Sequence, residues 1–107
     1  MREVAVEVDV NFDAVCFHAQ QCAEKYLKTR LIMSDIGFRR SHDLLYLLDL
    51  VISIEPQWQF LHDSLYKLTT FAVATRYPGL DSTREQALLS VEHLRVVRTT
   101  IRPIVNA

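Results

Sequence analysis

Apolar side chains recur every three or four residues through most of this chain, and that spacing predicts amphipathic helices. The first predicted helix follows Asn11, a good N-cap, and ends near Asp35, with Gly37 close behind it. Ser41 is a possible cap for a second helix, which is apolar on most of its circumference and should be largely buried. The positions expected to face the core in the first helix are Phe12, Cys16, Phe17, Ala19, Cys22 and Ala23, then Tyr26 or Leu27, and then Arg30 or Leu31. In the second helix they are Leu44, Leu48 and Val51, with Leu45, Leu47 and Ile52.

Two further helices are predicted in the second half of the chain. Glu55-Pro56 breaks the chain before a third helix, which stops at residues 77–79 with the sequence Tyr-Pro-Gly. The fourth helix has two possible capping boxes, Ser82 with Glu85 or Thr83 with Gln86. Pro103 ends or kinks that helix. The expected core positions are Trp58, Leu61, Leu65, Leu68 and Ala72 in the third helix and Ala87, Val91, Leu94, Val97 and Ile101 in the fourth.

The first ten residues follow a different pattern, because Val4, Val6, Val8 and Val10 lie on one side and Glu3, Glu7 and Asp9 on the other. A period of two is typical of a strand, but the rest of the sequence offers no partner strand. An extended arm, the start of a helix, and a segment paired with another chain all remain open.

Composition supports an all-α fold, since 2 glycines and 3 prolines are too few for the turns of an all-β fold. The 107 residues are enough for one domain with a single core, spanning residues 1–107. The short connections predict antiparallel neighbours in an up-and-down bundle of four to five helices. The formal charge of −1 supplies no global attraction for a nucleic acid, so binding to RNA is possible only locally.

The sequence also predicts where the protein resides. No apolar run approaches the ~20 residues that a spanning helix needs, so no contact with a membrane is expected. The first residues lack the basic start, apolar run and small-residue cleavage site of a signal peptide, so none is expected, and Cys16 and Cys22 are interpreted as reduced thiols. We therefore expect a cytoplasmic protein.

A polar stripe runs along the first predicted helix, formed by His18, Gln21, Lys25 and Lys28 at helical spacing. The simplest interpretation is a solvated face. Glutamine is nevertheless an unusual choice for mere solvation, because its amide suits fixed hydrogen-bond partners. The stripe could recognise a base edge and a phosphate, or could join a partner helix.

Three ordered motifs carry a resemblance to a known family: "FHAQQCAEKYLK" at residues 17–28, "RSHDLLYLL" at residues 40–48 and "RYPG" at residues 76–79. With the final amphipathic helix they resemble the HEPN domain, over about residues 12–105. The resemblance implies nucleotide binding, a fold that is commonly a homodimer, and a minimal nucleotidyltransferase as the partner in a two-component toxin–antitoxin pair. The family usually opens with a long helix before the first motif, so residues 1–11 are expected to be an arm or a truncated first helix.

The resemblance also supplies a test for ribonuclease activity. Ribonuclease members carry an arginine followed four to six residues later by a histidine, which polarise phosphate and move a proton. None of the histidines of this chain has an arginine at that spacing, and His93 with Arg98 has a similar gap only in the reversed order. A metal-independent ribonuclease with a displaced pair therefore stays an alternative, as does a purely structural adaptor, and the expected function is non-catalytic.

The candidate binding residues form two groups. The resemblance favours a ligand site formed by His18, Gln21, Lys25, Arg76 and Tyr77, where cations and an aromatic ring could hold a nucleotide. Arg39, Arg40 and His42 precede the second predicted helix and form a secondary candidate site for an anion, although Ser41 and Asp43 could satisfy the same N–H groups. His18 and Cys22 alone do not make a metal site, and the sequence indicates no cofactor.

Overall fold

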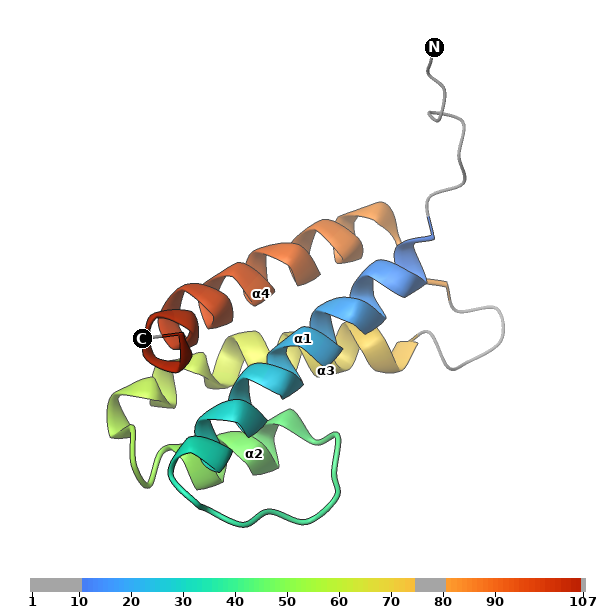
Figure 1. Cartoon of the computed structure of the whole chain (residues 1–107). Coiled ribbons are helices and arrows are strands. Elements are labelled where there is room, and N and C mark those ends of the chain that lie inside the picture. The colour runs from blue at the N-terminus through green and yellow to red at the C-terminus, as the bar shows by residue number, and fades with distance from the viewer. Residues whose placement is uncertain (1–10, 75–80, 107) are drawn as a thin grey trace.

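The computed structural model describes residues 11–74 and 81–106 (Figure 1). Within them the chain forms an all-α bundle, as predicted. The helices are α1 (Phe12–Met33), α2 (Leu44–Val51), the 3₁₀ helix η2 (Pro56–Leu61), α3 (His62–Ala74) and α4 (Arg84–Val105). The predictions for residues 1–10, and the end of the third helix at residues 77–79, lie outside the described residues.

Local chemistry sets most helix ends. The Asn11 side chain accepts a hydrogen bond from the Ala14 N–H at 3.0 Å, as expected of an N-cap. Thr83 and Gln86 form the capping box of α4, so the second of the two predicted boxes is the one that forms. After α1, Asp35 takes the left-handed conformation with φ of 55°, the role that the sequence suggested for Gly37.

Pro103 does not end α4, which continues to Val105. Proline has no N–H to offer the Thr99 carbonyl, but the turn beyond it is closed by the Asn106 N–H, which donates to the Arg102 carbonyl at 2.9 Å. Because only the last turn of the helix follows Pro103, the lost hydrogen bond costs less than it would in mid-helix.

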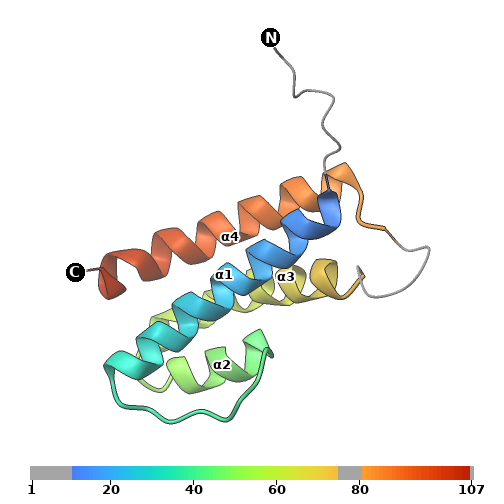
Figure 2. The same cartoon turned by 45° about the vertical axis from the view of Figure 1, so that its right-hand side comes forward.

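The helices do not all alternate in direction. α1 and α4 run side by side in the same direction, and α3 runs opposite to both (Figures 1 and 2). The connection of residues 34–43 returns along the bundle, so α2 also runs in the same direction as α1 instead of antiparallel to it. Two contacts fix this pairing, because Glu24 meets His42 before α2 and Arg30 meets Glu55 after it.

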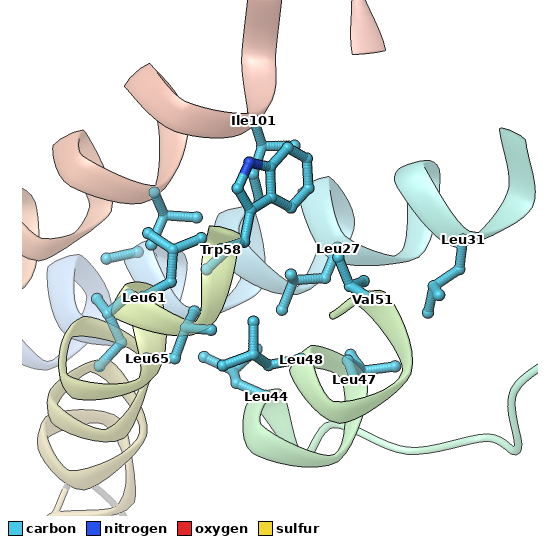
Figure 3. Close-up of a cluster of buried hydrophobic side chains, with 14 residues drawn as sticks. Leu27, Leu31, Leu44, Leu47, Leu48, Val51, Trp58, Leu61, Leu65 and Ile101 are labelled. Atoms are coloured by element: carbon cyan, nitrogen blue, oxygen red, sulfur yellow. The ribbon is translucent and has the colours of Figure 1, made fainter. Parts of the chain in front are cut away.

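The core is built from the inner faces that periodicity predicts. Leucines of α1, α2, η2 and α3 turn towards a common interior with Trp58 and Ile101 (Figure 3). The largest fully buried side chains are Cys16, Leu27, Leu31, Leu44, Leu47, Leu48, Val51, Leu61, Leu65, Leu68, Val97 and Ile101. α1 packs against α2, α3 and α4, which makes it the central helix of the bundle.

Three expected core residues are instead exposed. Phe17 and Cys22 of α1 lie on the surface, and Val91 of α4 is 42% exposed. Gln20 and Glu24 are buried, although periodicity placed them beside the solvated stripe. The inner face of α1 is thus rotated towards α2, and this rotation creates the polar site described next.

Candidate functional site

A buried carboxylate lies where α1 passes the start of α2. The Glu24 side chain is 6% exposed, and its Oε2 accepts a hydrogen bond from Lys28 Nζ at 2.9 Å. Nδ1 of His42 lies 2.9 Å from Glu24 Oε1. A carboxylate can only accept, so Nδ1 of His42 is the donor. Glu24 thereby ties the middle of α1 to the chain that leads into α2.

The two adjacent glutamines of α1 extend this connection. Gln20 Nε2 donates to the His42 carbonyl oxygen at 3.0 Å, and Gln21 Nε2 donates to Gln20 Oε1 at 2.8 Å. Their amides therefore have fixed partners, which explains why glutamine occupies these positions. We call Gln20, Gln21, Glu24, Lys28 and His42 the Glu24 cluster.

Two opposing effects set the ionisation of Glu24. Burial by itself raises the pKa of its carboxyl group, but hydrogen bonds from Lys28 and His42, together with their positive charges, outweigh burial and hold the pKa below its ordinary value of 4.5. The group is ionised at neutral pH. It therefore holds the imidazole of His42 in one orientation through Nδ1, while Nε2 has no hydrogen bond to any residue in the described ranges.

Two cations near the cluster lie against aromatic rings. Lys28 Nζ lies 5.7 Å from the centre of the Phe38 ring, and the Arg39 guanidinium lies 3.7 Å from the centre of the Tyr46 ring. The Arg39 N–H also donates to the Tyr46 hydroxyl at 3.0 Å. These contacts hold the connection between α1 and α2 against both helices. The next residue, Arg40, is exposed.

Side chains already occupy two N–H groups at the start of α2. Asp43 is the N-cap, and its carboxylate accepts hydrogen bonds from the N–H groups of Leu45 and Tyr46 at 3.0 and 3.3 Å. Ser41 Oγ accepts from the Asp43 N–H at 3.0 Å, so Ser41 supports the cap instead of forming it. An anion bound here would rely mainly on Arg39, Arg40 and His42, since the Asp43 carboxylate already occupies the N–H groups of Leu45 and Tyr46.

Only some of the predicted site residues belong to the Glu24 cluster. Gln21 and His42, assigned to separate sites from the sequence, belong to one cluster. His18 and Lys25 are exposed on α1, and the His18 ring meets only the edge of the Phe17 ring, at 5.8 Å between centres, among the contacts of the described residues. Arg76 and Tyr77 lie outside the described residues.

The helical periodicity did not predict Gln20 and Glu24 as members of the site. A signal for them does exist, since Cys16, Gln20, Glu24, Leu27 and Leu31 follow one another at helical spacing and the apolar members of that row are all fully buried. Two polar residues in such a row are buried, and buried polar groups need partners. The partner segment, however, comes from residues 41–43, which the row itself does not reveal.

His93 and Arg98, the pair considered for ribonuclease activity, point in different directions on α4. Nδ1 of His93 lies 3.0 Å from Ser64 Oγ, between α4 and α3, so this histidine belongs to helix packing. Arg98, five residues further on, is exposed and lies about 140° around the helix from His93. Within residues 11–74 and 81–106 no group of three or more metal-binding side chains gathers, which leaves His18 and Cys22 without further ligands.

Comparison with known proteins identifies the family of this chain. The family model described as HEPN domain matches residues 3–104. No curated protein and no solved structure matches the chain. None of the helices in the described part of the chain has both the length and the apolar character needed to cross a membrane.

Proposed function

Because the chain belongs to the HEPN domain family, we propose that it is a non-catalytic HEPN module that binds a nucleotide-like ligand beside the Glu24 cluster. The observation that carries this proposal is the His42 ring, which is 68% exposed while Glu24 holds its Nδ1. A preoriented imidazole bordered by exposed cations suits a phosphate group.

The surrounding side chains offer complementary groups for such a ligand. The exposed cations of Lys25 and Arg40 lie on the two segments that meet at the cluster and can neutralise phosphate charge. Gln21 uses its amide nitrogen within the cluster, so its Oε1 is left to accept a hydrogen bond from a base. His18 extends the same face of α1, and the contribution predicted for Arg76 and Tyr77 remains part of the proposal.

Calorimetric titration with ATP, GTP and dinucleotides tests this function. His42→Ala should weaken binding about 10- to 100-fold, because a hydrogen bond to a charged group contributes about 1.5–3 kcal/mol. His62→Ala is the matched control, since His62 is an exposed histidine of α3 outside the site, and it should leave the affinity unchanged. Flat titrations with all of these ligands would refute the proposal.

Ribonuclease activity is a second candidate, favoured by the same Glu24–His42 contact. A histidine oriented by a carboxylate, with its second ring nitrogen unoccupied by the described residues, has the arrangement of a general base, and Arg39 and Arg40 could stabilise phosphate charge. Incubation with structured and single-stranded RNA should then show cleavage that His42→Ala abolishes and His93→Ala retains. Equal residual cleavage by all three proteins would indicate contamination.

The proposal includes the assembly that the family resemblance implies. We expect a cytoplasmic homodimer that pairs with a minimal nucleotidyltransferase as a toxin–antitoxin module. Light scattering after size exclusion tests the dimer, and a monomer at micromolar concentration would count against it. A nucleotidyltransferase reading frame beside this one, with copurification of the two proteins, tests the pairing.

A further inference from the structure

The outer face of α4 carries a row of exposed residues that the Glu24 cluster does not use. They recur with alternating spacings of four and three, and every one is exposed. The row, which we call the α4 stripe, consists of Arg84, Leu88, Val91, Arg95, Arg98 and Arg102. This spacing keeps the side chains on one side of a helix and is the spacing of a seam that packs against another helix.

The stripe has an apolar half and a basic half. Leu88 and Val91 are 56% and 42% exposed and line a groove of about 260 Å³ with Phe12 and Val15 of α1. Arg98 and Arg102 line an open hollow of about 610 Å³ with Thr99, Pro103 and Asn106. Because members of the stripe line both hollows, the groove and the hollow open on the same side of α4.

The charges of the basic half are largely uncompensated. Arg95 pairs loosely with Glu92 at 3.4 Å, and both of those side chains are 62% exposed. Arg98 and Arg102 form no ion pair with any residue of the described ranges, and the stripe contains no acidic residue. A ligand for this surface must therefore supply negative charge beside the arginines and apolar groups beside the leucine and valine.

We propose that the α4 stripe binds an acidic amphipathic helix of another protein. The rise of 1.5 Å per residue places Arg98 about 10 Å beyond Val91 and makes the whole stripe about 27 Å long. A partner helix of about 18 residues would match it, with two apolar residues one turn apart and acidic residues about two turns further along. This is recognition of a helix in a groove, in which apolar anchors enter the groove and charge selects the partner.

The α4 stripe is less suited to two other partners, a second copy of this chain and single-stranded RNA. A second copy in antiparallel pairing would place Arg84 opposite Arg102 and Leu88 opposite Arg98, and parallel pairing would place each arginine against itself. Like charges facing each other destabilise both arrangements. Single-stranded RNA would engage the arginines, but it relies on aromatic rings for stacking, whereas the exposed apolar members of the stripe are aliphatic.

Two synthetic helical peptides test the proposal against the full-length protein by fluorescence anisotropy. Each has 21 residues, a leucine pair one turn apart, and four charged residues beginning two turns further on. The charged residues are glutamate in one peptide and lysine in the other, and each peptide is made in both chain directions. We expect the glutamate peptide, in one direction, to bind at least tenfold more tightly than either lysine peptide.

Variants separate the two halves of the stripe. Arg98→Gln with Arg102→Gln should weaken binding of the glutamate peptide at least tenfold, and Leu88→Ser should weaken it several-fold. Ser53→Glu with Gln57→Glu changes the net charge by the same two units at exposed positions outside both hollows, and should leave binding within twofold of the parent protein. Arg98→Glu with Arg102→Glu should reverse the preference and bind the lysine peptide.

Several results would overturn the proposal. One is equal or absent binding of all peptides to a folded protein, and another is tighter binding of a single-stranded RNA of 15 nucleotides than of the glutamate peptide. A third is a change of oligomeric state in the arginine variants by light scattering, which would assign the stripe to a second copy of the chain. None of these results depends on whether nucleotides bind at His42, so the proposal stands or falls separately from the proposed function.

Discussion

Replacing Glu24 with glutamine keeps the shape of the side chain and removes the charge that Lys28 and His42 share. The carboxylate is 6% exposed, and it accepts hydrogen bonds from both partners at 2.9 Å. Lys28 and His42 are 23% and 68% exposed, so water can solvate them once the charge is gone. We therefore expect Glu24→Gln to cost about 2–3 kcal/mol, within the range of a hydrogen bond to a charged group and below the 3–5 kcal/mol of a fully buried pair.

The loss of unfolding free energy caused by Glu24→Gln should become smaller as the pH falls. The folded protein holds the pKa of Glu24 below the ordinary value of 4.5, so the folded state favours the ionised form more than the unfolded state does. The stabilisation is fully present above pH 4.5 and is lost as the pH falls through the folded-state pKa. Glutamine does not titrate, so the difference in unfolding free energy between parent and Glu24→Gln should shrink on going from pH 7 to pH 3.

Urea unfolding followed by far-ultraviolet circular dichroism measures both quantities. Glu92→Gln is the matched control, because it removes a carboxylate from α4 that pairs with Arg95 at 3.4 Å while both side chains are 62% exposed. Exposed pairs of this kind contribute about 0–1 kcal/mol, so this variant should unfold almost like the parent. The reasoning is refuted if Glu24→Gln costs no more than Glu92→Gln at pH 7, or if its cost stays constant down to pH 3.

Three further predictions concern the helix ends and the second ion pair. Thr83→Ala removes the capping box of α4 and should lower the unfolding free energy by about 1 kcal/mol. Ser82→Ala leaves the box intact and is the control. Equal losses of unfolding free energy in the two variants would contradict the assignment of Thr83 as the N-cap. Arg30→Met removes the guanidinium that lies 2.9 Å from Glu55 Oε2, while the hydrogen bond from Gln57 Nε2 to Glu55 Oε1 remains. Since the Arg30 and Glu55 side chains are both 14% exposed, we expect the unfolding free energy measured in urea to fall by about 2–3 kcal/mol; a loss under about 0.5 kcal/mol would show that the pair contributes little. Pro103→Ala restores an N–H for the Thr99 carbonyl and should raise the melting temperature. The gain in unfolding free energy should be smaller than the ~3 kcal/mol that a proline costs in mid-helix, because only the last turn follows Pro103. A lower melting temperature would show that the proline ring packs favourably.

Much of the fold could be predicted because helix signals are local. Asn11 and Thr83 cap the helices that follow them because a side-chain oxygen reaches an N–H two or three residues away, which needs no information from the rest of the chain. The break at Pro56 has the same local origin. The inner row of α3, from Leu65 to Ala72, was predicted from spacing because residues one turn apart share a face in any α-helix.

The candidate site was only partly predictable. Gln21 and His42 were identified as candidates, but in separate sites, because 20 intervening residues separate them and spacing along one helix cannot report contacts with another segment. The burial of Gln20 and Glu24 was missed because they look like members of a polar face until the His42 backbone and ring are placed against them. Their cost of burial is offset only by partners from a distant part of the chain.

What the sequence by itself determined is therefore the approximate position of each α-helix, the caps that begin α1 and α4, and the rows of residues that share a face. Only the tertiary structure decided which side of each helix is covered. Periodicity places Phe17, Glu24 and Val91 on their helices but does not say where a neighbour packs. The path of residues 34–43 brings His42 against Glu24 and buries it, whereas Phe17 and Val91 are exposed. The physical reason is that a helix is held by hydrogen bonds within four residues, whereas its orientation is chosen by contacts between residues far apart in the sequence.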